Sequence, residues 1–178
     1  MARREVFLPN LELLAGGAWW TVGAGVLDSG TGTVVLAAGL GITGGLFVAV
    51  RRRHGSGVPL PPGGRTRLLR LAAVAVALGA LVVGSLTFLN AGELAVPAVC
   101  VLVGAVLVPL SSQLEQRSVL AVGAALMVLG AVGALLALNS AGLLYPQGVV
   151  GLGAGILLWT AAAYRTGLLA ELRGRVER

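Results

Sequence analysis

The sequence offers few side chains that could carry out nucleophilic, acid–base or metal chemistry. Its 178 residues include one cysteine, Cys100, and one histidine, His54. A single cysteine excludes an intramolecular disulfide and a thiolate metal site, and His54 lies in a polar segment between apolar runs. The sequence has no nucleophile paired with a base, no metal-ligand cluster and no phosphate-binding loop. We therefore predict a protein that is not an enzyme and holds no cofactor or metal.

The composition is that of a chain solvated largely by lipid. Apolar residues make up 57 % of the sequence and charged residues 11 %, whereas about 25 % of the residues of a soluble domain are charged. So few charges could not cover the surface of a soluble globule of this size. The basic residues are all arginine, and they separate apolar runs instead of alternating with aromatic residues, so nucleic acid is not an expected partner.

The polar side chains expected deep in the apolar runs are hydroxyls and indoles. A proton-coupled carrier or ion pump ordinarily needs an ionisable group at membrane depth, and none is expected there. Hydrogen bonding to a small uncharged solute is the chemistry that remains, with packing as the alternative role. Trp19 and Trp20 are neighbours on a helix, so their side chains diverge by about 100° and cannot face one groove. The candidate cavity-lining residues are Trp19, Trp20, Thr43, Ser85 and Thr87.

The apolar runs predict one all-α membrane domain over residues 1–178, because about 20 apolar residues cross the hydrocarbon core of a bilayer. The first run is short and carries Glu12, so it could instead lie on the membrane surface and leave five spans. Tyr145, Trp159 and Tyr164 fall near span ends and are expected to anchor helices at the interface. The six predicted spans are 11–27, 32–50, 68–90, 95–112, 118–138 and 146–164.

Arginine is confined to alternate connections between the predicted spans. All thirteen arginines lie in the N-terminal arm, in 51–70, at position 117 or from 165 onward. By the positive-inside rule, the linker 51–67, the tail 165–178 and both termini face the cytoplasm of a bacterial inner membrane. The arginines around the linker are expected to bind anionic headgroups, and these residues are Arg51, Arg52, Arg53, Arg65, Arg67 and Arg70.

Two of the three asparagines share a pattern, G-x5-N-x6-P-x6-G-A, that aligns Asn90 with Asn139 and Pro97 with Pro146. Asparagine tolerates the left-handed conformation that ends a helix, and proline suits the first turn of the next helix. We interpret both asparagines as caps of helical hairpins, with ligand binding at an outer mouth as the alternative. Asp28 is the expected equivalent in a diverged first hairpin. The predicted tandem hairpins are 11–50, 68–112 and 118–164.

The stretch TVVLAAGLGITGGLFVAV, residues 33–50, resembles the second helix of the repeats in HdeD-type acid-stress membrane proteins. That resemblance implies six spans in three hairpins and a role in stress physiology, with no catalytic residues to transfer to this chain.

Small residues recur at every fourth position in several spans, a spacing that lets helices approach closely in lipid. They are expected to pack within one subunit, or alternatively against a second copy in a homo-oligomer. The sets are Ala37, Gly41 and Gly45; Ala80 and Gly84; and Gly151 and Gly155.

The leading functional hypothesis from the sequence is a passive channel or carrier for a small uncharged solute. The alternative is a structural or regulatory membrane protein that responds to stress or binds a partner. A solute path should leave a continuous cavity that touches Thr43, Ser85 or Thr87, whereas a scaffold should be packed shut.

The topology predicts that cysteines introduced at Ser56 and Ser140 react with a membrane-impermeant reagent from opposite sides of the membrane. Labelling of both positions from the same side would contradict six spans with both ends inside.

Overall fold

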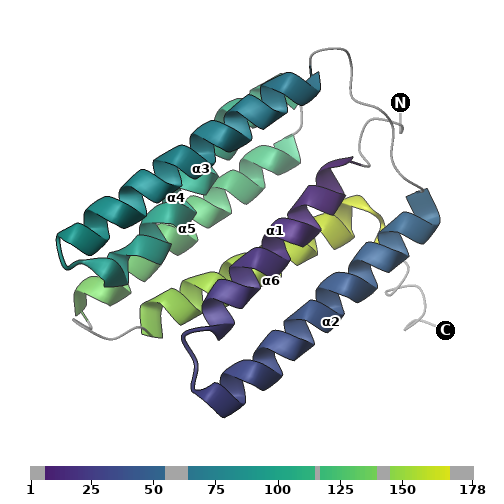
Figure 1. Cartoon of the computed structure of the whole chain (residues 1–178). Coiled ribbons are helices and arrows are strands. Elements are labelled where there is room, and N and C mark those ends of the chain that lie inside the picture. Colours follow the sequence, from purple (N-terminus) through teal and green to yellow (C-terminus); the bar gives the residue numbers. More distant parts are fainter. Residues whose placement is uncertain (1–6, 55–63, 115–116, 140–144, 169–178) are drawn as a thin grey trace.

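The computed structural model describes residues 7–54, 64–114, 117–139 and 145–168, and every described element is a helix. The predicted all-α class is therefore confirmed, and the helices lie close to the predicted spans. In chain order they are α1 (Phe7–Ala24), α2 (Ser29–His54), α3 (Gly64–Phe88), the 3-10 turn η1 (Gly92–Leu94), α4 (Ala95–Leu114), α5 (Arg117–Asn139) and α6 (Tyr145–Arg165), as Figure 1 shows.

The predicted linker 51–67 needs a correction at both ends. The helix α2 continues to His54 and α3 begins at Gly64, so the two arginine clusters lie on helix ends. Arginine is a good helix former, so the clusters themselves give no reason for a helix to stop. Arg165, the first residue of the predicted tail, is the last residue of α6. The chain then turns at Gly167, whose left-handed φ of 71° suits glycine.

The six α-helices of the described residues form two units of three. In the α4–α5 unit, α4 packs most extensively on α5 and α3 lies against α4; in the α1–α6 unit, α1 packs most extensively on α6 and α2 lies against α1 (Figure 1). Contacts of α6 with α5 and, to a smaller extent, with α4 join the two units. The two helices of each predicted hairpin do touch, but the most extensive packing of α1 and of α4 is with helices from other predicted hairpins. The three-hairpin arrangement stays a prediction.

Glycine allows the close helix contacts inside each unit. A Cβ atom on Gly151 of α6 would lie 2.6 Å from the Cα atom of Gly23 on α1, and one on Gly104 of α4 would lie 2.6 Å from the carbonyl oxygen of Gly123 on α5. Gly155 likewise faces α1, near the carbonyl oxygen of Gly16 at 3.0 Å. Of the predicted small-residue sets, the one on α6 therefore packs within the subunit. In the other two sets the glycines have open space around them: Gly41 and Gly45 on α2, and Gly84 on α3.

The protein has the helices of a multi-pass membrane protein. By length and composition, α2, α3, α4, α5 and α6 can each cross a bilayer. The shorter α1 is not among them because its 18 residues include Asn10 and Glu12, yet it runs lengthwise beside α6 (Figure 1). The outward faces of α2 and α3 carry exposed apolar side chains, including Leu81 and Phe88, and lipid is the solvent that suits such a surface.

The charged side chains separate the bundle into an arginine end and a turn end. The arginine end holds the C-termini of α2 and α6 and the N-termini of α3 and α5, with the arginines that these carry (Figure 1). The turn end holds the α1–α2 and α3–α4 connections, where Asp28 and Glu93 lie. At that end the amide Nε2 of Gln147, in the first turn of α6, donates to the carbonyl oxygen of Gly92 in η1 at 2.8 Å.

The two related asparagines end their helices by different means. Asn90 has a φ of 55°; its backbone N–H donates to the Thr87 carbonyl at 3.1 Å, and the N–H of Ala91 donates to the Leu86 carbonyl at 2.8 Å. This pair of bonds around a left-handed residue is a Schellman motif. Asn139 has no left-handed backbone, and its side-chain amide donates to the Leu135 carbonyl at 3.0 Å. The expected left-handed geometry therefore holds for Asn90 and needs correction for Asn139.

We predict that Asn90→Leu lowers the free energy of unfolding by about 1 to 2 kcal/mol, because a branched residue pays the cost of a left-handed backbone. Asn90→Gly should leave stability nearly unchanged, and Asn139→Leu should cost about 1 kcal/mol for one lost hydrogen bond. Denaturation in detergent micelles measures all three. Equal losses for Asn90→Gly and Asn90→Leu would mean that the asparagine side chain, not its backbone, matters.

Candidate functional site

A cleft of about 610 Å³, here called the lateral cleft, separates the two helix units on one side of the bundle. It exists because α1 and α4 both pack on α6 without packing closely on each other, while α5 and α6 close the opposite side. Its α1 wall consists of Ala15, Ala18, Trp19 and Val22; its α4 wall consists of Ala95, Val96, Val99 and Val103; Val83 of α3 and Gln147 of α6 complete it.

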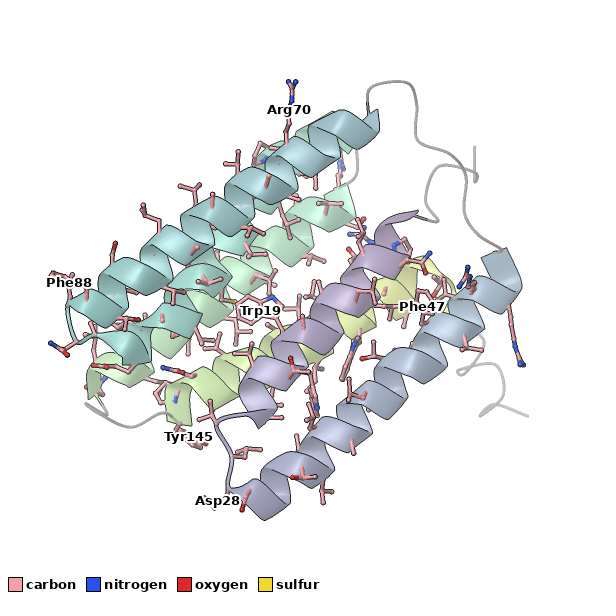
Figure 2. The ribbon with its side chains drawn as sticks, viewed as in Figure 1. Trp19, Asp28, Phe47, Arg70, Phe88 and Tyr145 are labelled. Atoms are coloured by element: carbon pink, nitrogen blue, oxygen red, sulfur yellow. The ribbon has the colours of Figure 1, made fainter. Side chains whose placement is uncertain are left out.

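The lateral cleft is apolar along its length and has a polar group near one end. It extends from Ala95, at the start of α4, to Val103, which is about 12 Å along a helix axis or less than half of the hydrocarbon thickness of ~30 Å. Gln147 lies at the turn end of the cleft. Figure 2 shows Trp19 on the side of α1 that faces the α4–α5 unit.

The two neighbouring tryptophans face different surroundings, as their helical spacing predicts. Trp19 lines the lateral cleft. Trp20 turns the other way, where its indole N–H donates to the carbonyl oxygen of Val35 on α2 at 2.7 Å and its ring lies 4.9 Å from the ring of Trp159. The indole of Trp20 packs directly over Gly39. Trp20 therefore joins α1, α2 and α6 and leaves only Trp19 for the cleft.

The three hydroxyl residues that were expected to line a solute path lie away from the lateral cleft. Thr43 packs against Gly17 of α1 and donates to the carbonyl oxygen of Gly39 in its own helix at 2.8 Å. Ser85 and Thr87 are exposed on α3, and the Thr87 hydroxyl donates back to the Val83 carbonyl at 2.8 Å. The structure thus brings none of these hydroxyls together with Trp19.

A buried ion pair fastens α1 to α6 at the arginine end. A guanidinium nitrogen of Arg165 lies 3.0 Å from a carboxylate oxygen of Glu12, and the two side chains are only 7 % and 11 % exposed. Next to the pair lies a core cluster that includes Leu13, Val50 and Trp159. This pair could not be predicted from the sequence, because its residues lie near opposite ends of the chain.

Trp159 and Cys100, two other residues considered in the sequence, are both buried in the helix packing. Trp159 is 6 % exposed, so its expected role as an interface anchor is wrong, whereas Tyr145 and Tyr164 are exposed at helix ends as anticipated. Cys100 is buried, and its thiol lies 3.3 Å from the carbonyl oxygen of Leu126. In the described part of the chain, no three acidic, histidine or cysteine side chains gather in a way that could hold a metal ion.

The exposed arginines available for headgroups lie at the arginine end. Arg51, Arg52 and Arg70 are exposed there, and the guanidinium of Arg51 lies 5.8 Å above the ring of Phe47, within cation–π range. In Figure 2, Arg70 projects outward from the start of α3. The side chains of the other three arginines, Arg53, Arg65 and Arg67, lie outside the described residues.

Comparison of this chain with protein-family models, with curated proteins and with solved structures gives no match. The resemblance to the HdeD-type proteins therefore stays a prediction.

We predict that Glu12→Gln and Arg165→Met each destabilise the fold by about 3 kcal/mol, because each leaves a buried charge without its partner. The double variant Glu12→Gln/Arg165→Met should cost much less than the two single losses together. Arg117→Met, at an exposed arginine of the same end, is the control and should change little. Thermal unfolding in micelles measures the cycle, and strictly additive losses would show that the two side chains do not interact.

Proposed function

We propose that this chain is a non-enzymatic regulatory protein of the bacterial inner membrane that binds a molecule from the bilayer and conducts no polar solute. The observation that carries the proposal is the chemistry of the lateral cleft. Its walls are small apolar side chains, and Trp19 and Gln147 are its only polar lining residues among those described. A path for a polar solute needs hydrogen-bonding groups along its length, whereas an apolar molecule needs none.

The surroundings of the lateral cleft also favour binding over conduction. Its length of about 12 Å reaches only part of the way through the bundle. At the arginine end, the Glu12–Arg165 pair and the cluster around Trp159 hold α1 and α6 together. A molecule that enters from the side would therefore meet a closed inner end.

For the membrane topology we propose six spans with both termini in the cytoplasm. The arginine end would face the cytoplasm, since positive residues are retained on that side, and its exposed arginines would bind anionic headgroups there. We count α1 as the sixth span because it runs antiparallel to α6 for 18 residues, about 27 Å. Its less apolar composition is tolerable because Glu12 has Arg165 beside it.

A conduit for a small uncharged solute is the second candidate. It would have to run between copies of the chain, because Ser85 and Thr87 are exposed on α3 beside Gly84, which has open space around it. Such a homo-oligomer would bring these hydroxyls together.

Solute flux into proteoliposomes separates the two candidates. With a panel of neutral and charged solutes, we expect the purified protein to give the same flux as protein-free liposomes. Flux of a neutral solute that saturates with its concentration, and that falls in the variant Ser85→Val/Thr87→Val but not in the control Thr33→Val, would replace our proposal with the conduit.

A further inference from the structure

The lateral cleft has the dimensions and orientation of a site for one hydrocarbon chain. It runs parallel to the helices, from the turn end toward the middle of the bundle, and it lies on the side where the two units are not joined. A lipid can therefore place a chain in it from the side while its headgroup stays at the membrane surface. Small side chains such as Ala15, Ala18 and Ala95 leave room for the hydrocarbon chain.

The polar groups near the turn end of the lateral cleft, here called its mouth, bear on which headgroup can bind there. Gln147 lines the mouth, and its amide nitrogen donates to Gly92. Glu93 follows Gly92 directly and lies two residues before Ala95 of the cleft wall. Asp28 lies at this end too, but in the α1–α2 connection and not beside α4, and the described arginines lie at the other end. A carboxylate next to the start of α4 repels an anionic headgroup and attracts an ammonium group.

We propose that the lateral cleft binds one acyl chain of a zwitterionic phospholipid from the leaflet at the turn end, with the ammonium headgroup beside Glu93. This inference rests on the proposed function and names its ligand class. Trp19 lies in the wall along the bound chain, and its indole serves as a natural reporter because Trp20 and Trp159 are packed elsewhere.

The test is quenching of tryptophan fluorescence by phosphatidylethanolamine with bromine atoms midway along one acyl chain, titrated into nanodiscs of unbrominated lipid. We expect quenching that saturates at a low mole fraction and that is lost in Trp19→Phe. Brominated phosphatidylglycerol should bind about threefold more weakly, and Glu93→Gln should remove most of that difference, which is the size of a surface charge interaction. Asp28→Asn is the matched control and should retain the preference.

A variant that fills the site keeps the test specific. Ala18 is exposed to the cleft, so Ala18→Phe should abolish the saturable quenching while circular dichroism and the unfolding midpoint stay those of the unchanged protein. Val99→Phe fills the cleft from the opposite wall and should act alike. Val76→Phe, on the exposed face of α3 and outside the cleft, should leave the quenching intact.

Two results would overturn the inference. One is quenching that rises in proportion to the brominated fraction, equally for both headgroups, as contact with bulk lipid would produce. The other is saturable quenching that persists in both cleft-filling variants. Neither result bears on the expected lack of solute flux, and flux of a solute would not change the expected quenching. Failure of the inference and failure of the proposed function are therefore distinguishable.

Discussion

The close approach of α1 to α6 determines how the other helices of the bundle pack. Lipid gives helices no hydrophobic reason to associate, so their contact must come from packing and polar interactions. Gly23 and Gly151 supply the first, because a side chain at either position would collide with the opposite backbone. Glu12 and Arg165 supply the second at the arginine end. Together they make α6 the most buried of the described helices, with residues such as Val150 fully enclosed.

The lateral cleft is a consequence of that arrangement. With α1 on one side of α6 and α5 on another, α4 is drawn to α5 by the contact of Gly104 with Gly123 and does not close on α1. The space between α1 and α4 then has walls from both units but a floor only from α6. Because those walls are apolar, the same packing that stabilises the bundle leaves few hydrogen-bonding groups for a polar solute and an apolar surface for the lipid chain that we propose.

The sequence could predict those features that depend on local pattern. Hydropathy located the helices to within a few residues, arginine marked one end of the bundle, and the 100° rotation between neighbours separated Trp19 from Trp20. Which helix packs against which could not be predicted, because this depends on contacts between residues that are distant in the sequence. Gly41 and Gly45 of α2 have the same spacing as Gly151 and Gly155 of α6, yet of these four only the α6 pair meets another helix closely. In α2 the close contact is instead at Gly39, outside the expected set, where Trp20 packs.

Disulfide formation between engineered cysteines tests the contact of α1 with α6. A Cβ atom on Gly148 would lie 3.8 Å from the Cβ of Val26, just beyond α1, which is the spacing of a relaxed disulfide. In a Cys100→Ala background in native membranes, mild oxidation should therefore cross-link Val26→Cys with Gly148→Cys within one chain. The pair Val26→Cys with Gly84→Cys, on the open face of α3, should stay reduced. Failure of the first pair to cross-link, or equal cross-linking of both, would contradict the α1–α6 contact around which the two units and the lateral cleft are built.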